Sequence, residues 1–575
     1  MLPLFFIYSW KDNLKNENTN MKQRITTLSM LLLVMSLSVT AQFKLIGKGP
    51  SFEEPEKGYD KLLLLKNGKT AYIHAESSGL RVKIFGADYK QAGIGLINST
   101  QGKLSELNVE GIFESGGNIV ALVSEYEKNV PILYRFVIDG NTGRKISEDK
   151  IAQMQKESIG SVFANAFGVP VADFLVRKDP SSDHYVVAVF NTGTSESDKR
   201  LEFITYDGTH KEISRSYMSS PENKFKYVNL LDLAILPNQE VFAFIYVYNT
   251  ESKGGKENDL LMAAFKPGDQ EVAYTNMNLD EKDLVTDGIM KYNPAMKKLI
   301  AMTCVKEKTK RKGDTYSTYY DFPMYFIDPT NKNIQTHAGL SLDAVDKKHR
   351  ELFGSKDGYA GILQNLYIHN DGGYTVILEG LRTVTTTKTV DQYYGSLAVL
   401  NYGMNGSLKS STLIPKSQEY NNNALSGGGV SFGWGASAAR KTMKKTISML
   451  YHRDRDWMGS MLGGGNQYKS FAYLSGPSKD YVLINDVDDN EELIRKGKLK
   501  TIMGVSACDG FSFVTNGNDV LPARSYVFGA PKDNDHNMAV FSVSDYDPNT
   551  NVYVTLRLEV DGRDKKVRVV WLQPE

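Results

Sequence analysis

One pattern of apolar and polar residues returns along most of this 575-residue chain. A strand of alternating residues ends in a turn rich in Asp, Gly, Asn or Pro, and a second strand follows. The stretch "YVTLRLEVDGRDKKVRVVW" shows it most clearly, because Val554, Leu556 and Leu558 alternate with polar residues. Asp561 and Gly562 then predict a tight hairpin turn. Long amphipathic helices are scarce, so the pattern predicts a chain built of hairpins.

Hairpins of this kind begin near residues 80, 131, 200, 259, 322, 395, 481 and 553. A further strand precedes most of them, as in "NIVALVSEY" and "KLIAMTCV". Three or four strands per unit, repeated about eight times, is typical of a β-propeller, whose small antiparallel sheets bury their faces only against one another. The sequence therefore predicts an all-β fold, a β-propeller of about 7–8 irregular blades with long loops.

A second architecture stays open because regular hairpins fade between residues 412 and 470. It is a smaller propeller followed by a C-terminal β-sandwich, with a boundary near 412–430. In the single-propeller alternative, the first and last blades must join, since an open ring leaves two unpaired sheet edges. The strands "FKLIGKG" and "KKVRVVWLQPE" are predicted to complete a shared blade or to pack at one seam.

This pattern resembles that of secreted bacterial β-propeller proteins in general. The resemblance covers most of the chain, but it is one of pattern alone. Trp-Asp repeat ends, kelch glycine pairs and sialidase Asp-boxes do not occur in the sequence. The resemblance therefore implies a fold and an exported location, and it implies no site residues.

Residues 21–41 have the order of a signal peptide. Lys22 and Arg24 precede an apolar core at 28–39, and the small Ala41 predicts cleavage before the next residue. The apolar core is too short to span a bilayer, which needs about 20 residues. We expect residues 42–575 to form the propeller and to be exported, to the periplasm or exterior of a Gram-negative bacterium, with no membrane span. Residues 1–20 fit no export signal and are interpreted as a start assigned too early.

Charge argues against nucleic acid as a partner. Removing residues 1–41 takes away four basic and two acidic residues, which leaves a net charge of −1. A near-neutral chain exerts no overall attraction on a polyanion such as DNA. The basic stretch "KEKTKRKGD" at 306–314 could contact an anion, although a solvated insertion in one blade explains it as well.

The two cysteines, Cys304 and Cys508, lie 204 positions apart in the sequence. Cys304 is part of "LIAMTCV", which reads as a buried strand. An exported protein can form a disulfide, but two independent buried thiols fit this context better than one bridge.

The glycine-rich stretch 427–445, "GGGVSFGWGASAARKTMKK", partly matches a dinucleotide-binding turn. Gly433, Gly435 and Ala438 have the required spacing between a short apolar run and a segment that could be helical. Alternating strand–helix units, which that fold needs, do not surround it. We therefore interpret it as a loop between blades and predict no organic cofactor.

A cluster between two glycine-rich stretches is the candidate binding site. It holds both charge signs, an imidazole and an indole, which could line a pocket or carry acid–base chemistry. A solvated turn with ion pairs would have the same composition. Its members are His452, Arg453, Asp454, Arg455, Asp456 and Trp457.

Two loops place oxygen-bearing side chains at alternate positions, as calcium sites do. Neither has the sixth-position glycine or the distal glutamate of an EF-hand, so ordinary polar turns are the alternative. The candidate calcium ligands are Asp486, Asp488 and Asn490, with Glu492 following, and Asp545, Asp547 and Asn549, with Asn551 following.

The motif of a zinc protease, His-Glu-x-x-His, is absent from the sequence. The residues 429–433, "GVSFG", match the Gly-x-Ser-x-Gly motif of serine hydrolases, but alternating strand–helix units, which that elbow needs, do not surround them, so catalytic residues stay unknown. Two functions remain. The first is an exported binding or scaffold protein that presents its loops and pore to a glycan, peptide or protein partner, and the 32 tyrosines suit such contacts. The alternative is a glycan-active enzyme, a hydrolase or lyase, with carboxylates gathered from several blades. Three or more carboxylates converging at the pore would favour the enzyme.

Overall fold

The computed structural model places Phe43–Glu575 in one compact unit. The predicted start and signal peptide therefore lie outside the described residues, and they remain predictions. Within 43–575 the structure describes all residues except 102–103, 105–106, 129, 157–172, 192–198, 219–223, 250–256, 270–271, 280–282, 314, 338, 386–389, 421–455, 463–464, 532–534 and 562–563.

The described residues form a β-propeller of eight blades, each a small antiparallel sheet. Blades 1 and 2 consist of β2 (Tyr59–Leu64), β3 (Thr70–Glu76), β4 (Gly79–Phe85), β5 (Gln91–Ile97), β6 (Asn108–Ser115), β7 (Asn118–Glu127), β8 (Val130–Asp139) and β9 (Lys145–Gln153). Blades 3 and 4 consist of β10 (Asp173–Lys178), β11 (Tyr185–Phe190), β12 (Leu201–Tyr206), β13 (Glu212–Met218), β14 (Tyr227–Ile235), β15 (Val241–Tyr248), β16 (Asn258–Phe265) and β17 (Ala273–Asn276).

Blades 5 and 6 share one ten-stranded sheet, because an additional strand joins them. Blade 5 consists of β18 (Val285–Asn293), β19 (Lys298–Lys312), β21 (Met324–Ile327) and β22 (Ile334–His337), with the joining strand β20 (Thr315–Asp321). Blade 6 consists of β23 (Gly361–Ile368), β24 (Tyr374–Thr385), β25 (Val390–Tyr402) and β26 (Leu408–Ile414), with β27 (Gln418–Tyr420) at the end of β25. Helix α3 (Asp343–Phe353) lies between the two blades in sequence.

Blades 7 and 8 end the ring. Blade 7 consists of β29 (Phe471–Ser475), β30 (Asp480–Asp486), β31 (Asp509–Val514) and β32 (Arg524–Tyr526), with helix α6 (Asp489–Arg495) after β30. Blade 8 consists of β33 (His536–Ala539), β34 (Asp545–Asp547), β35 (Val552–Asp561), β36 (Asp564–Pro574) and β1 (Phe43–Phe52). Two 3₁₀ turns, η6 (Asn466–Tyr468) and η7 (Phe541–Val543), and the short strand β28 (Ser460–Met461) complete this region.

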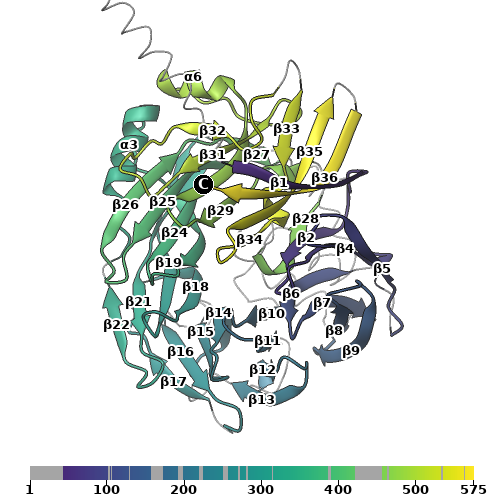
Figure 1. Ribbon diagram of the computed structural model, residues 1–575. Coiled ribbons are helices and arrows are strands. Elements are labelled where there is room, and N and C mark those ends of the chain that lie inside the picture. The colour runs from purple at the N-terminus through teal and green to yellow at the C-terminus, as the bar shows by residue number, and fades with distance from the viewer. Residues whose placement is uncertain are drawn as a thin grey trace, which may run out of the picture. The chain divides into compact units, whose positions relative to one another are not determined.

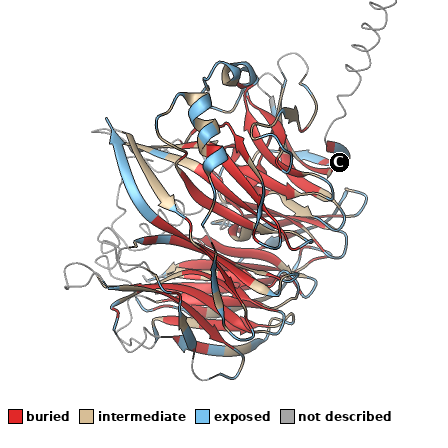
Figure 2. Ribbon diagram, turned by 90° about the vertical axis from the view of Figure 1, so that its left-hand side faces the viewer, coloured by how far each residue is buried: buried red, intermediate tan, exposed pale blue. Residues whose placement is uncertain are grey.

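The innermost strand of each blade contacts the innermost strand of the next one around the ring (Figure 1). One buried carboxylate shows how the ring is tied together. Asp232 of β14 accepts hydrogen bonds from the Arg177 side chain of β10 at 2.8 Å and from the Met290 backbone N–H of β18 at 2.9 Å. Blades 3, 4 and 5 thus share one polar contact, and the strands behind it are buried (Figure 2).

The ring closes as predicted, by pairing of the first and last strands. β1 runs antiparallel to β36, with Phe43 opposite Pro574 and Phe52 opposite Val567. Trp571 of β36 is 1% exposed, and its indole N–H donates a hydrogen bond to the Thr70 hydroxyl of blade 1 at 2.8 Å. The closing strand is therefore also the seam between blades 8 and 1.

Most predicted hairpins are the two outer strands of a blade. Those beginning near 80, 131, 200, 259, 322 and 395 correspond to β4–β5, β8–β9, β12–β13, β16–β17, β21–β22 and β25–β26. The alternative with a C-terminal sandwich is wrong, because residues after 460 supply blades 7 and 8 of the same ring.

The hairpin predicted near 481 is wrong in its second half. β30 is followed by helix α6 rather than by a strand. The segment "DNEELIR" contains good helix formers, with acidic residues in the first turn and Arg495 in the last, which suits the helix dipole. Glu491 and Arg495 also form an i,i+4 ion pair.

Both cysteines are free and buried, which confirms the prediction of two independent thiols. Cys304 lies in β19 and Cys508 lies just before β31. The fold is therefore held by sheet packing rather than by a covalent bridge.

Closure can be tested by removing residues 565–575. We expect the whole propeller to lose stability, because buried side chains such as Trp571 contribute roughly 1.5–3 kcal/mol each against a total of ~5–15 kcal/mol. Trp571→Ala alone should cost about 3–5 kcal/mol, whereas Lys566→Ala, at an exposed position of the same strand, should change little. Calorimetric unfolding measures both. A truncated protein that melts at the parent temperature would contradict the closure model.

Candidate functional site

A pocket of about 760 Å³ opens where the innermost strands of blades 6, 7 and 8 end. Its wall follows the ends of β23, β29 and β34 and the turns after them. Towards the ring axis it reaches Lys61 of β2 and Asp456. The pocket thus combines groups from three neighbouring blades with groups at the axis.

The pocket wall is rich in aromatic and amide side chains. Two of the tyrosines, Tyr367 and Tyr546, are half-buried, so their rings remain accessible. The aromatic members are Tyr367, Tyr402, Tyr473, Phe541, Tyr546 and Tyr553, and the amide members are Asn370, Asn401, Asn516 and Asn518.

A hydrogen-bonded cluster lies between blades 6 and 7 at this wall. His369 Nε2 lies 3.0 Å from the Tyr473 hydroxyl and 2.9 Å from the Thr375 hydroxyl. Thr375 directs its single proton to the Asn401 carbonyl at 2.5 Å, so it accepts from His369 or Tyr473. The imidazole is therefore held in a fixed orientation by groups of two blades.

Burial shifts the titration of this cluster. It lowers the pKa of His369 below its ordinary value, so the imidazole favours the neutral form. It raises the pKa of Asp480, whose carboxylate accepts a hydrogen bond from Ser475 at 3.0 Å. It also raises the pKa of Tyr473 well above its ordinary range, so the phenol keeps its proton. Burial thus brings the pKa values of His369 and Asp480 closer together.

Four carboxylates line the pocket, from blades 6, 7 and 8 and from the axis. Asp371 lies 3.6 Å from the Lys409 ammonium. Asp545 accepts the backbone N–H groups of Leu64 and Tyr546 at 2.7 and 3.0 Å. Each of these two carboxylates is therefore engaged with its own partner, and together with Asp456 and Asp480 they line the cavity rather than form one cluster.

Of the predicted cluster 452–457, the structure describes Asp456 and Trp457. The Asp456 backbone carbonyl accepts a hydrogen bond from Lys61 at 2.9 Å, and its carboxylate accepts one from Asn365 at 2.5 Å. The Trp457 ring lies 6.1 Å from Phe113. These partners belong to the innermost strands of blades 1, 6 and 2, so this segment lies at the ring axis.

The axial segment then continues into β28, which adds to the inner edge of blade 1 by pairing Ser460 with Asp60. The remaining members of the predicted cluster, His452, Arg453, Asp454 and Arg455, lie outside the described residues, as does the glycine-rich stretch 427–445. Asp456 therefore lines the pocket, whereas Trp457 is not among the lining residues, and a binding role for all six residues stays a prediction.

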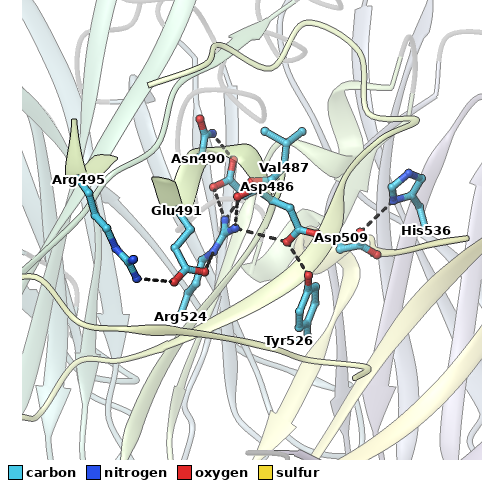
Figure 3. Close-up of polar contacts among 10 residues, drawn as sticks. Asp486, Val487, Asn490, Glu491, Arg495, Asp509, Arg524, Tyr526 and His536 are labelled. Carbon is cyan, nitrogen blue, oxygen red and sulfur yellow. Dashed lines mark hydrogen bonds and ion pairs between the residues drawn. The ribbon is translucent and has the colours of Figure 1, made fainter. Parts of the chain in front are cut away.

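The first predicted calcium loop surrounds an arginine in this structure (Figure 3). Arg524 donates to Asp486 Oδ2 at 3.2 Å and to the Asp488 backbone carbonyl at 2.6 Å. The Asn490 amide donates to Asp486 Oδ1 at 2.6 Å, and Tyr526 donates to Asp488 at 2.5 Å. The guanidinium thus lies among the predicted ligands, and it fastens helix α6 to blade 7.

The second predicted calcium loop forms a local turn. Asp547 accepts the Asn549 backbone N–H at 3.0 Å and the Thr550 hydroxyl at 2.6 Å, whereas Asp545 faces blade 1. Within the part of the chain that the structure describes, no three His, Cys, Asp or Glu side chains are arranged to hold a metal ion. Calcium at either loop stays a prediction.

Sequence reasoning did not single out His369, Tyr473 or Asp480. His369 follows β23 and Asp480 begins β30, each beside a turn, whereas Tyr473 is the central residue of β29. His369 and Tyr473 are about 100 residues apart, so no local signal in the sequence indicates that they meet.

The Arg524 network yields a stability test. Burial raises the pKa of Asp486 to about 6, with Asn490 and Arg524 favouring the charged form. Arg524→Met should cost about 3–5 kcal/mol near neutral pH, because it leaves a buried carboxylate without a cation.

Adding Asp486→Asn to this variant should recover part of the loss, and the loss should shrink as pH falls below about 6 and the carboxyl takes up a proton. Arg495→Met removes an exposed ion pair and should cost less than about 1 kcal/mol. Urea unfolding at several pH values measures all three. Equal losses for Arg524→Met and Arg495→Met would refute the role of the buried network.

No helix of the described residues is both long and apolar enough to cross a membrane.

Comparison with solved structures finds similarities at low sequence identity. A polysaccharide lyase, Uly1, is 9% identical with a TM-score of 0.37, over 84% of this chain and 92% of that one. A PL25 ulvan lyase bound to -[GlcA(1-4)Rha3S]- is 10% identical with a TM-score of 0.32, over 81% and 92%. A prolyl endopeptidase is 10% identical with a TM-score of 0.28, over 75% and 55%. No protein-family model matches the chain, and no curated protein matches it in sequence. At these TM-scores the similarities decide neither family nor function.

Proposed function

We propose that this propeller is an exported binding protein and that the pocket between blades 6, 7 and 8 holds a saccharide. The observation that carries the proposal is the composition of the pocket wall, in which tyrosine rings, two of them accessible, occur together with amide, hydroxyl and carboxylate groups. A sugar matches this combination of apolar and polar groups, since it has apolar C–H faces and a rim of polar hydroxyl groups.

The aromatic rings of the pocket are held in place before any ligand arrives. Tyr367 packs against Tyr473 with ring centroids 4.5 Å apart. Tyr546 donates its hydroxyl proton to the Ser475 carbonyl or the Asn551 side chain, at 3.1 and 3.0 Å. Rigid rings bind at a small entropic cost, because little side-chain freedom is lost on contact.

The amide side chains of the wall can both donate hydrogen bonds to hydroxyl groups and accept hydrogen bonds from them. Asn370, Asn516 and Asn518 each offer a donor and an acceptor, as a sugar hydroxyl does. This match distinguishes a saccharide from an apolar ligand, for which these amides would have to be desolvated without compensation.

The size of the pocket favours a small ligand over a protein partner. About 760 Å³ lies within the range of ~300–1,000 Å³ of small-molecule sites. A stable protein partner needs about 800 Å² of surface on each side, which a concave pocket of this size does not offer. A peptide or protein partner would therefore have to bind elsewhere on the molecule.

Binding can be tested on a glycan array, followed by calorimetric titration of the best oligosaccharide. Tyr367→Ala should weaken that affinity by about tenfold or more, since one aromatic contact removed from a site is worth 1 kcal/mol or more. Tyr274→Ala, at a tyrosine 43% exposed on β17 and away from the pocket, should leave it unchanged. A folded protein that binds no glycan, or an equal loss in both variants, would count against the proposal.

A second candidate is a glycan-active enzyme, a hydrolase or lyase, working in the same pocket. It is favoured by four lining carboxylates from several elements and by the neighbouring His369 and Asp480. A neutral imidazole can accept a proton, and a carboxyl with raised pKa can donate one, which is the division of roles that general acid–base catalysis needs.

The enzyme candidate predicts a pH profile. Activity on the bound glycan should fall on acidification, as His369 takes up a proton, and on alkalinisation, as Asp480 loses one. Asp480→Asn should remove the alkaline limb, whereas Asp547→Asn, in a turn outside the pocket, should keep both limbs. Reducing-end and unsaturated-uronate assays distinguish hydrolysis from lysis. Binding without turnover in either assay would leave the binding protein as the function.

A further inference from the structure

A sheet extension on blades 5 and 6 is not explained by the pocket. β19 has 15 residues, β24 has 12 and β25 has 13, whereas the strands of blades 1 to 4 have 4 to 10. β20 pairs with the far half of β19 and with β24, and β27 pairs with the far half of β25. The result is a five-stranded extension in the order β19, β20, β24, β25 and β27.

The strand register sorts the side chains of this extension onto two faces. Lys310, Ser317, Arg382, Tyr393 and Glu419 stand opposite one another across the five strands, so they share a face. Alternation along each strand adds further residues to that face. The added residues are Lys308 and Lys312 of β19 and Tyr319 of β20.

On this face the cations rest on tyrosine rings. The Lys308 and Lys310 ammonium groups lie 5.5 and 5.4 Å from the centre of the Tyr319 ring. The Arg382 guanidinium lies 4.5 Å from the centre of the Tyr393 ring. Cation–π contact holds each charge near a defined place without neutralising it.

The face carries more positive than negative charge. All residues from Lys306 to Lys312 are exposed, and Arg382 is exposed as well. Glu307 pairs with Lys308, Asp357 pairs with Lys310, and Glu419 adds one further carboxylate to the face, so among the described residues the positive surplus rests on Lys312 and Arg382. This local surplus contrasts with a chain whose formal net charge is only +1.

Protection of an open sheet edge explains part of this pattern but not all of it. Lysines on an exposed edge strand prevent pairing with other chains, and β19 runs beyond its pairing with β18 from Lys306 onwards. Arg382 and Tyr393, however, lie on β24 and β25, which have paired strands on both sides. Edge protection gives no reason for a cation–tyrosine pair in the middle of the sheet.

We propose that the basic–tyrosine face, formed by Lys308, Lys310, Lys312, Tyr319, Arg382 and Tyr393, binds an acidic polysaccharide. Its cations are well separated, since alternate residues of a strand lie about 7 Å apart and strands about 4.8 Å apart. Such spacing suits a polymer with isolated carboxylates. The tyrosine rings and the Ser317 hydroxyl between them meet the uncharged parts of its sugar units.

A nucleic acid fits this face less well. It carries a phosphate at every ~3.4 Å of each strand and is bound mainly by dense positive charge. The face offers four cations, two of them already paired with carboxylates. The proposal is independent of the saccharide pocket, which lies on the strand ends of blades 6 to 8.

The test uses the whole protein and a polygalacturonate oligosaccharide as the probe, with neutral dextran and oligo-dT as comparison ligands. Affinity is measured by microscale thermophoresis at low salt and at 0.15 M NaCl. Arg382→Glu with Lys312→Glu should weaken polygalacturonate binding by about tenfold or more at low salt, because two attractive charges become repulsive. Charge reversal keeps the strand edge charged, so solubility is preserved.

Arg311→Glu is the matched control. Arg311 lies on β19 like Lys312, but its side chain is on the other face of the sheet, where it pairs with Tyr316 across the strands. Arg311→Glu therefore changes the net charge by the same amount as each single reversal in the test variant and leaves the basic–tyrosine face unchanged. Its effect should be no more than about twofold, and wild-type affinity should fall with salt, since exposed charges are screened over about 8 Å at 0.15 M. Equal losses for Arg311→Glu, tighter binding of oligo-dT, or no binding of polygalacturonate by the wild type would each overturn the proposal.

Discussion

Pairing of β1 with β36 is the constraint on which the rest of the structure depends. A four-stranded sheet with two apolar faces is stable only when both faces are covered, and in a ring each blade covers its neighbours. That arrangement requires the last blade to meet the first. Two contacts join these blades here. The backbone of β1 pairs with that of β36, and the Trp571 indole donates a hydrogen bond to Thr70 of blade 1.

Closing eight blades leaves the innermost strands facing a common axis, and polar groups there need partners. Arg177 and Asp232 satisfy one another and the backbone of blade 5. Asp456 and Trp457 enter the same region from the connection between blades 6 and 7, and they contact innermost strands of blades 1, 2 and 6. The pocket for which we propose a saccharide is the space that remains beside this segment, so its position depends on which residues fill the axis.

The two proposed binding surfaces use different parts of a blade. The pocket is made of the ends of innermost strands and the turns that follow them, where backbone geometry is held by the ring. The basic–tyrosine face is made of strands that continue past the blade, where no neighbouring blade covers them. The first therefore offers a preformed cavity and the second an open sheet face, which explains why one suits a small saccharide and the other a polymer.

The sequence by itself determined the all-β class and indicated about 7–8 repeating units in a closed ring, while a smaller propeller with a C-terminal β-sandwich stayed open. These follow from alternation within strands and from turn residues, which act over a few positions, and from the strongly β-forming segments near the two ends. The prediction from sequence was wrong after β30, where a strand was expected but the helix-forming residues of "DNEELIR" form helix α6. The sequence also singled out a charged and aromatic cluster between glycine-rich stretches, one member of which, Asp456, lines the pocket, and the binding role of the cluster stays a prediction.

Only the tertiary structure decided the rest of the site. His369 and Tyr473 are about 100 residues apart, and they meet because blades 6 and 7 are neighbours in the ring. Asp486 and Asp488 have the spacing of calcium ligands, yet Arg524 from two strands further on lies among them. Which side chains share a cavity depends on how sheets pack, and that information is distributed over the whole chain rather than carried by any short stretch.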